Sequence, residues 1–193
     1  MIGKPGGALS LKVDYSEAPV PPHYYVADYF YVKLVGFRVL IVFGKFDEAG
    51  KELRNKLEIY IPVTSFLRQM HVSSREFHQT LREAATKFQF QPIGAGSLDV
   101  GLDKNQGKVQ SIQSNNVLMA FVDMDCMLDF FYLSPRELHF NPPKRKDIEL
   151  QALIRVMIDP PTMLGLLNEC EIIAKELEAK LPKGQDYDEV ESA

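Results

Sequence analysis

Aromatic and basic side chains alternate with apolar ones in the segment YYVADYFYVKL, which begins at Tyr24. In a β-strand, alternate residues point to opposite faces, so the odd-numbered tyrosines and Lys33 would share one face of a sheet, opposite Phe30 and Val32. Bases stack on exposed rings and phosphates pair with cations, so this pattern is typical of single-stranded nucleic-acid binding. Tyrosine is also a common strand residue, which offers a purely structural explanation. The candidate nucleic-acid-binding residues are Tyr25, Tyr29, Tyr31, Lys33, Arg38 and Tyr60.

Two carboxylates, Asp123 and Asp125, lie between apolar residues in the segment FVDMDCMLD. Paired carboxylates can hold the metal ions of a phosphoryl-transfer site. Aspartate is also a frequent turn residue, and the strand pattern described below places both residues at a hairpin turn. We therefore favour the turn, and metal-dependent phosphoryl transfer is the weakest of the functions considered.

The histidines and cysteines do not have the spacing of a catalytic or metal site. His71 and His78 are seven residues apart with no third ligand nearby in the sequence, and Cys126 and Cys170 lie alone in apolar or helical stretches. The glycines and serines likewise match neither GxGxxG nor GxSxG. We expect a protein that is not an enzyme, that binds no cofactor or metal, and whose two cysteines are free thiols.

The composition is that of a soluble globular protein, with 46% hydrophobic and 25% charged residues in a chain of 193. The chain lacks the roughly 18 consecutive apolar residues of a membrane helix and an apolar run of signal-peptide length, so we expect a cytoplasmic protein. Charge is distributed unevenly. Residues 1–96 contain 12 basic and 9 acidic side chains, whereas residues 97–193 contain 10 basic and 17 acidic ones.

The chain contains two similar stretches. Residues 29–44 can be aligned with residues 117–132 at an offset of 88, which matches Phe30 with Leu118, and each stretch is predicted to form a hairpin. A third alternating segment and then a helical pattern follow each hairpin. The predicted fold is α+β, a tandem of two β-β-β-α units with pseudo-twofold symmetry, antiparallel sheet and two amphipathic helices. Its parts are a flexible N-terminal segment (1–22), a first unit (23–88), a connecting segment (89–116), a second unit (117–181) and an acidic tail (182–193).

The helices are expected near residues 64–88 and 162–181. Asp159 is a candidate N-cap for the second helix, and Pro160 suits its first turn. The first helix is expected to break near residues 72–74, where Ser73 and Glu76 have the spacing of a capping box.

The first unit contains Tyr31, Val32, Phe43, Gly44 and the strand–helix junction IYIPVTSFL. In these residues it resembles a small uncharacterised bacterial family of unknown function. The second unit has Phe130, Phe131 and the junction IRVMIDPPTMLGLL, but Tyr132 stands where the family pattern would place the glycine. The order of elements is also distantly similar to the repeats of Pur-type and Whirly-type single-strand nucleic-acid binders, a likeness of topology alone.

The segment VLMAFV of the second unit has no polar face, because Val117, Met119 and Phe121 alternate with three further apolar residues. A sheet that is apolar on both faces must be covered on both. We therefore expect Val117, Met119 and Phe121 to be buried by intrachain helices or to form a protein interface. The leading predicted function is a non-enzymatic binding or assembly module that homo-oligomerises or docks a protein partner, and single-stranded nucleic-acid binding is the alternative.

Overall fold

The computed structural model describes residues 18–46, 53–72, 74–95, 109–122, 124–134 and 150–180. It confirms the α+β class. In chain order its elements are β1 (Tyr24–Val26), β2 (Tyr29–Val35), β3 (Arg38–Phe46), β4 (Leu53–Pro62), α1 (Val63–Val72), α2 (Ser74–Phe88), β5 (Gln110–Gln113), β6 (Asn116–Val122), β7 (Asp125–Tyr132), β8 (Gln151–Ile158) and α4 (Pro160–Lys180).

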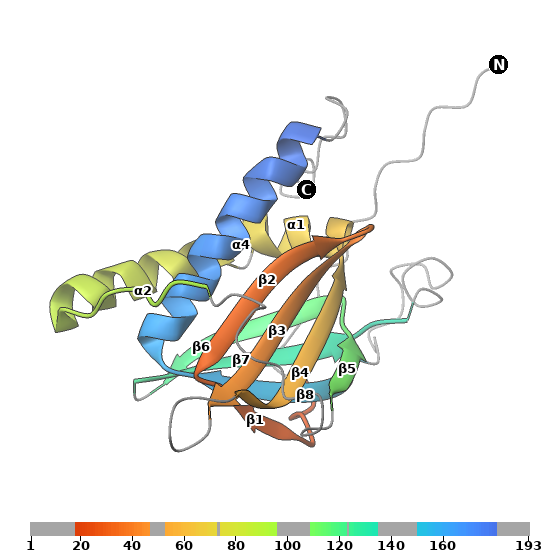
Figure 1. Ribbon diagram of the computed structural model, residues 1–193, viewed down its shortest axis with the longest axis horizontal. Helices are drawn as coiled ribbons and strands as arrows, with labels where there is room; N and C mark the ends of the chain where they lie inside the picture. The colour runs from red at the N-terminus through yellow and green to blue at the C-terminus, as the bar shows by residue number, and fades with distance from the viewer. Residues whose placement is uncertain are drawn as a thin grey trace.

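The described strands form two four-stranded sheets, ordered β2-β3-β4-β5 and β1-β8-β7-β6 (Figure 1). In each sheet, three strands that follow one another in the chain form an antiparallel meander. The fourth strand joins in parallel, with β5 beside β4 and β1 beside β8. Each strand that precedes a meander therefore completes the sheet built by the other half of the chain.

The chain changes sheets between Ala27 and Asp28. The backbone N–H of Ala27 donates to the carbonyl of Met157 in β8 at 2.9 Å, and the N–H of Asp28 donates to the carbonyl of Gly44 in β3 at 3.1 Å. The Asp28 carboxylate then accepts the N–H of Phe46 at 2.9 Å. The alternating segment read as one strand from the sequence is thus two strands in different sheets.

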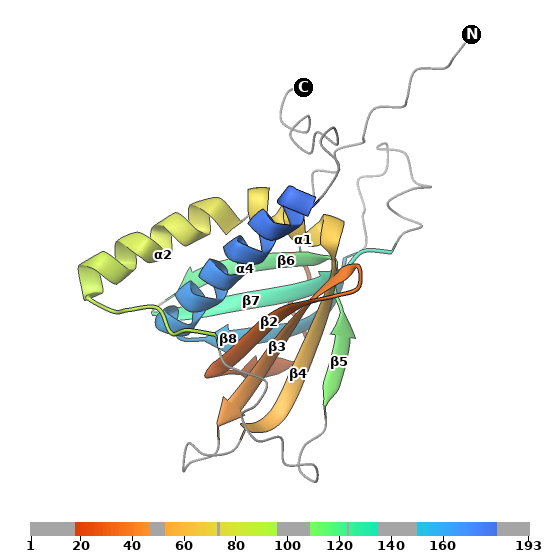
Figure 2. The same ribbon diagram turned by 45° about the horizontal axis from the view of Figure 1, so that its top comes forward.

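The core lies where the inner faces of the two sheets meet. Phe43 of β3 and Phe130 of β7 are both fully buried, and their rings pack edge to face with centroids 6.1 Å apart. The helices cover the remaining side of this core, α4 over β2 and the α1–α2 pair over β6 (Figure 2). The predicted N-cap is confirmed, because the Asp159 carboxylate accepts the N–H of Thr162 at 2.7 Å at the start of α4.

The structure has α1 ending at Val72 and α2 beginning at Ser74, on either side of the predicted break. Ser73, which the sequence suggested as a cap, lies outside the described residues. The hydroxyl of Ser74 donates to the carbonyl of Met70 at 2.6 Å, so it occupies a carbonyl at the end of α1.

The alignment at an offset of 88 is wrong by one residue. Both hairpins leave two residues in the turn, pairing Val35 with Arg38 and Val122 with Asp125, so the two hairpins correspond at an offset of 87. Phe30 therefore matches Val117, and both lie in the core. Because side chains alternate between faces, the slip of one residue exchanged the two faces of β6. The internal duplication itself stays a prediction.

Candidate protein-interaction site

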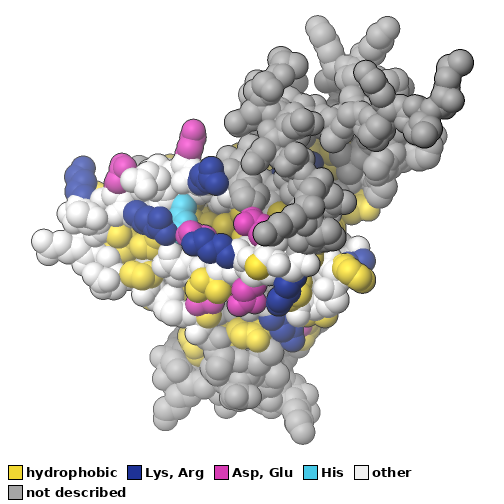
Figure 3. Space-filling model, turned by 90° about the horizontal axis from the view of Figure 1, so that it is seen from above, with side chains coloured by type: hydrophobic (Ala, Val, Ile, Leu, Met, Phe, Trp, Pro, Cys, Tyr) yellow, Lys and Arg dark blue, Asp and Glu magenta, His cyan; other side chains and the backbone are white. Residues whose placement is uncertain are grey.

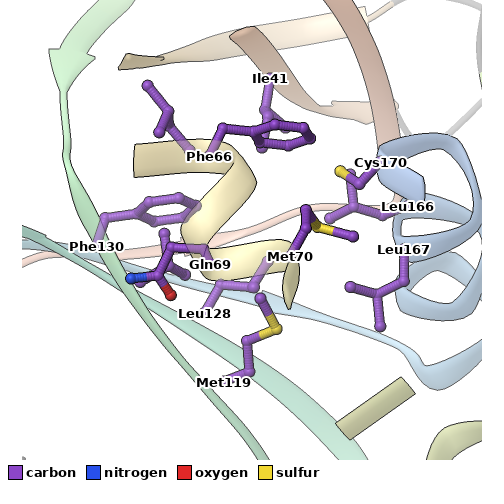
Figure 4. A pocket seen from close by; sticks show the side chains of 12 residues that line it. Ile41, Phe66, Gln69, Met70, Met119, Leu128, Phe130, Leu166, Leu167 and Cys170 are labelled. Carbon is purple, nitrogen blue, oxygen red and sulfur yellow. The ribbon is translucent and has the colours of Figure 1, made fainter. Parts of the chain in front are cut away.

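The predicted interface residues Val117, Met119 and Phe121 lie on the inner face of β6. Val117 is only 5% exposed, and the other two are partly buried against the core. Met119 shares a small cavity with Met70 of α1 (Figure 4). The helices of the same chain thus cover this face, as one branch of the prediction required, and the three residues do not form a free surface.

Two of the predicted nucleic-acid-binding tyrosines do not join the others. Tyr29 is 7% exposed, and its ring packs edge to face against Phe46 with centroids 5.7 Å apart. Tyr25 lies on β1 in the other sheet and packs against the core. Burial, with a smaller effect of the negative charge of Asp28, raises the pKa of Tyr25 to about 12. Both placements correct the prediction. The crossing between sheets at Ala27 and Asp28 separates Tyr25 from Tyr31, whereas Tyr29 lies in β2 with Tyr31 but is buried by its packing against Phe46.

The other four predicted residues share the outer face of the β2-β3-β4-β5 sheet. They are Tyr31, Lys33, Arg38 and Tyr60. The hydroxyl of Tyr60 donates to the carboxylate of Glu58 at 3.0 Å, and the hydroxyl of Ser111 donates to the same oxygen at 3.0 Å. The hydrogen bond to Glu58, assisted by burial, raises the pKa of Tyr60. On this face, polar side chains and charges of both signs surround the buried apolar residues Leu40 and Val42 of β3.

The outer face of the β1-β8-β7-β6 sheet is different, because an apolar row crosses all four of its strands. Direct pairing in register aligns Val26 with Met157, Met157 with Met127, and Met127 with Ala120. Val26 is 53% exposed and the other three are partly exposed. We call Val26, Met157, Met127 and Ala120 the outer apolar row. Their neighbours Val156 and Cys126 point inward and are fully buried, so the row and the core occupy opposite faces of the same strands.

An ion pair lies beside the outer apolar row. The guanidinium of Arg155 donates to both carboxylate oxygens of Asp129, each at 2.6 Å, and Asp129 is only 7% exposed. Hydrogen bonding to Asp129 raises the pKa of Arg155. The Tyr24 ring lies 5.8 Å from the guanidinium carbon. The row is therefore bordered by charges that neutralise one another.

Two carboxylates lie beside the outer apolar row, at the end of strands β7 and β8. Cys126 of β7 and Ile158 of β8 are register partners. Asp125 precedes Cys126 and Asp159 follows Ile158, so both carboxylates lie at the same end of these two antiparallel strands. Burial, and then the negative charges of Asp159 and Asp125, raise the pKa of the Cys126 thiol to about 12. Val122 and Met124 are exposed at the same end of the strands. We call Val122, Met124, Asp125 and Asp159 the acidic end of the row.

A small cavity of about 30 Å³ lies between α1, α4 and the inner faces of the sheets (Figure 4). Its walls are apolar except for Gln69, which is nearly fully buried. The side-chain oxygen of Gln69 has no hydrogen-bond partner among the described residues. The volume is about that of a single water molecule, so the cavity does not suit a larger ligand.

The helical side of the molecule has intermingled basic and acidic side chains around a histidine (Figure 3). The imidazole Nε2 of His78 lies 3.0 Å from the Asn168 amide oxygen, and Glu171 accepts from Lys175 at 2.7 Å and from Arg82 at 3.1 Å. Burial, and then the positive charge of Arg82, lower the pKa of His78 despite the carboxylate 3.7 Å away. These charges pair with one another and connect α2 to α4.

The structure describes one of the two aspartates considered as metal ligands. Asp123 lies outside the described residues, and Asp125 is exposed at the start of β7. Within the described ranges, no three histidine, cysteine, aspartate or glutamate side chains gather as a metal site would require. Both cysteines are buried and free.

Sequence reasoning identified the strand with two apolar faces but exchanged its inner and outer faces. The outer face holds Leu118, which packs against the buried cluster of Phe131, Leu133 and Leu150, together with Ala120 and Val122. The predicted residues point inward. The methionines Met127 and Met157, at alternate positions between buried residues, are the signal that could have located this face.

Comparison of the chain with protein-family models, with curated proteins and with solved structures found no match. Among the helices that the structure describes, none combines the length and the apolar character needed to cross a lipid bilayer.

Proposed function

We propose that this protein is a non-enzymatic assembly module that binds a second copy of itself through the outer apolar row. The observation that supports this proposal is the alignment of Val26, Met157, Met127 and Ala120 across four strands on an outer sheet face. Contiguous exposed apolar patches on soluble proteins commonly mark protein-interaction sites. Methionine side chains also adapt readily to the shape of a partner.

The other sheet shows that this architecture does not require an apolar outer face. Its corresponding outer rows are Tyr31, Val42, Glu58 and Ser111, and then Lys33, Leu40, Tyr60 and Gln113. Their apolar members, Val42 and Leu40 of the central strand, are buried, and the others are polar. Two sheets of the same strand order thus have outer faces of different chemistry. This contrast supports an interaction role for the apolar one.

The proposal is tested by measuring molar mass with light scattering over a range of concentrations. The wild-type chain should self-associate, and Met127→Lys should shift the mass to that of a single chain, because the new charge would be buried in the interface. Gln113→Lys, on the outer face of the other sheet, is the matched control and should behave as wild type. A wild-type protein that stays monomeric at high concentration would overturn the proposal.

Single-stranded nucleic-acid binding is a second candidate function, favoured by the shared outer face of Tyr31, Lys33, Arg38 and Tyr60. Oligonucleotide affinity should then fall with rising salt and fall further in Tyr31→Ala, because counterion release and base stacking contribute separately. Absence of binding at low salt would remove this candidate.

A further inference from the structure

The tip of the β2–β3 hairpin displays an aromatic ring to solvent. Phe37 is 92% exposed, and Leu34 and Val35 beside it are also exposed. Gly36 takes the positive φ of +58° that the tight turn requires. The carbonyl of Phe37 accepts the N–H of Val63 at 3.1 Å, which ties the tip to the start of α1. The ring is therefore presented from an anchored backbone.

The same hairpin is basic. Residues 29–46 contain Lys33, Arg38 and Lys45 and no aspartate or glutamate. Arg38 is exposed and pairs with Val35 at the base of the turn, immediately beside Phe37. The tip thus combines an exposed aromatic anchor with an adjacent cation, the two residue classes that most often dominate binding energy at interfaces.

The acidic end of the outer apolar row offers the complementary surface. Val122 and Met124 present exposed apolar side chains, and Asp125 and Asp159 end the adjacent strands there. The β2–β3 tip and the β6–β7 turn lie toward opposite ends of the molecule (Figures 1 and 2). One copy can therefore present its tip to a neighbour while its own acidic end stays available.

We infer that the β2–β3 hairpin tip of one copy docks on the acidic end of the outer apolar row of another, with Phe37 against Val122 and Met124 and with Arg38 paired to Asp125. The inference rests on the proposed function, because Val122 and Asp125 are register partners two residues beyond Ala120 and Met127 of the outer apolar row, so the docked tip would lie against both. A contact between two different patches is heterologous, so its repetition produces head-to-tail chains or rings. A contact of row against row would instead leave Phe37 in solvent and bring no cation to Asp125.

The first experiment mixes two variants of the full chain. Phe37→Ser disables the tip and Met127→Lys disables the row, and circular dichroism and thermal unfolding establish that each variant remains folded. In sedimentation velocity the wild type should form species larger than a dimer as concentration rises, and each variant alone should be a monomer. A 1:1 mixture should give a heterodimer and nothing larger, because only one intact tip and one intact row remain.

The second experiment exchanges charges. Arg38→Asp alone and Asp125→Arg alone should each weaken self-association at least about tenfold, since each places like charges together. Mixing these two variants should restore assembly, because every contact then joins opposite charges. Gln113→Lys again serves as the unaffected control.

The outcomes separate the inference from the proposed function. If Met127→Lys is a monomer while Phe37→Ser assembles as the wild type does, the row binds another surface and the inference is overturned alone. A monomeric wild type overturns both. If that monomer binds vesicles containing phosphatidylserine and Phe37→Ser does not, the hairpin tip is a membrane anchor instead. If the monomer binds oligonucleotide and Phe37→Ser does not, the tip is a nucleic-acid contact.

Discussion

At the residue scale, Asp129 and Arg155 form an ion pair whose carboxylate is nearly buried beside an otherwise apolar row. Removing one partner of such a pair leaves an uncompensated charge, whereas replacing both with apolar residues is often close to neutral. We expect Arg155→Met to lower the free energy of unfolding by about 3 kcal/mol, and Asp129→Leu combined with Arg155→Met to recover most of that loss. Urea denaturation of the single and double variants measures both values. Equal losses in the two would contradict the expectation.

Gln69 is a second residue whose side chain lowers the stability of the fold. Its buried side-chain oxygen faces an apolar cavity and has no hydrogen-bond partner among the described residues. An unsatisfied buried polar atom costs on the order of 1–3 kcal/mol. Gln69→Met has a similar shape and no such atom, so it should raise the free energy of unfolding by about 1 kcal/mol. Chemical denaturation measures the change, and Gln69→Ala is the control, which should destabilise by enlarging the cavity. No gain in Gln69→Met would indicate that water satisfies the oxygen.

Individual residue positions were predictable from the sequence where alternation alone decided them. Tyr31 and Lys33 share an outer face as expected. Tyr25 could not be placed with them, because the backbone bonds of Ala27 and Asp28 to different sheets leave no mark on the alternating pattern.

At the scale of elements, α2 and α4 are joined by a histidine whose protonation is disfavoured in the folded state. The pKa of His78 is lowered from its ordinary value of 6.5, first by burial and then by Arg82. As pH falls below 6.5 the unfolded chain takes up a proton that the folded chain does not, so stability is lost until the lowered folded-state pKa is reached. Above pH 6.5 the contribution of His78 to the free energy of unfolding is constant.

We therefore expect the wild-type protein to lose stability between pH 7 and pH 5, and His78→Gln to lose less. Glutamine can still donate to Asn168 but does not titrate. The measurement is the free energy of unfolding of both proteins across this range, which stays above the ordinary pKa of 4.5 for Glu171 and so avoids its protonation. Parallel pH profiles in the two proteins would show that His78 is not the responsible group.

Most elements were predictable because their periodicity is strong. The hairpin over 117–132, the strand near 150–158 and the helix after Asp159 agree with the structure. The pairing of β1 with β8 was not predictable, since three residues contain too little pattern to indicate a partner more than a hundred residues away. The one-residue slip in β6 followed from assigning three residues to a two-residue turn.

At the scale of the whole molecule, the reciprocal placement of β1 and β5 makes each half depend on the other. A fragment of residues 1–96 lacks β5, and a fragment of residues 97–193 lacks β1, so each has an incomplete sheet and half of the shared core. We expect neither fragment alone to unfold cooperatively, and the two together to regain a cooperative transition. Thermal unfolding followed by circular dichroism of each fragment and of the mixture measures this. A cooperative transition in either fragment alone would show that the halves are independent.

The parallel pairing of β1 with β8 also sets an order of events during synthesis. β1 ends at Val26 and β8 begins at Gln151, so the ribosome makes more than a hundred further residues before the partner of β1. At ordinary rates of translation, the interval between the two strands is on the order of ten seconds. During that time β2, β3 and β4 have emerged and can pair locally, while the strand that pairs with the edge of β1, β8, has not yet been made. Neighbouring chains on one polysome could offer their β8 to this edge, so slower initiation of translation should reduce strand exchange between chains.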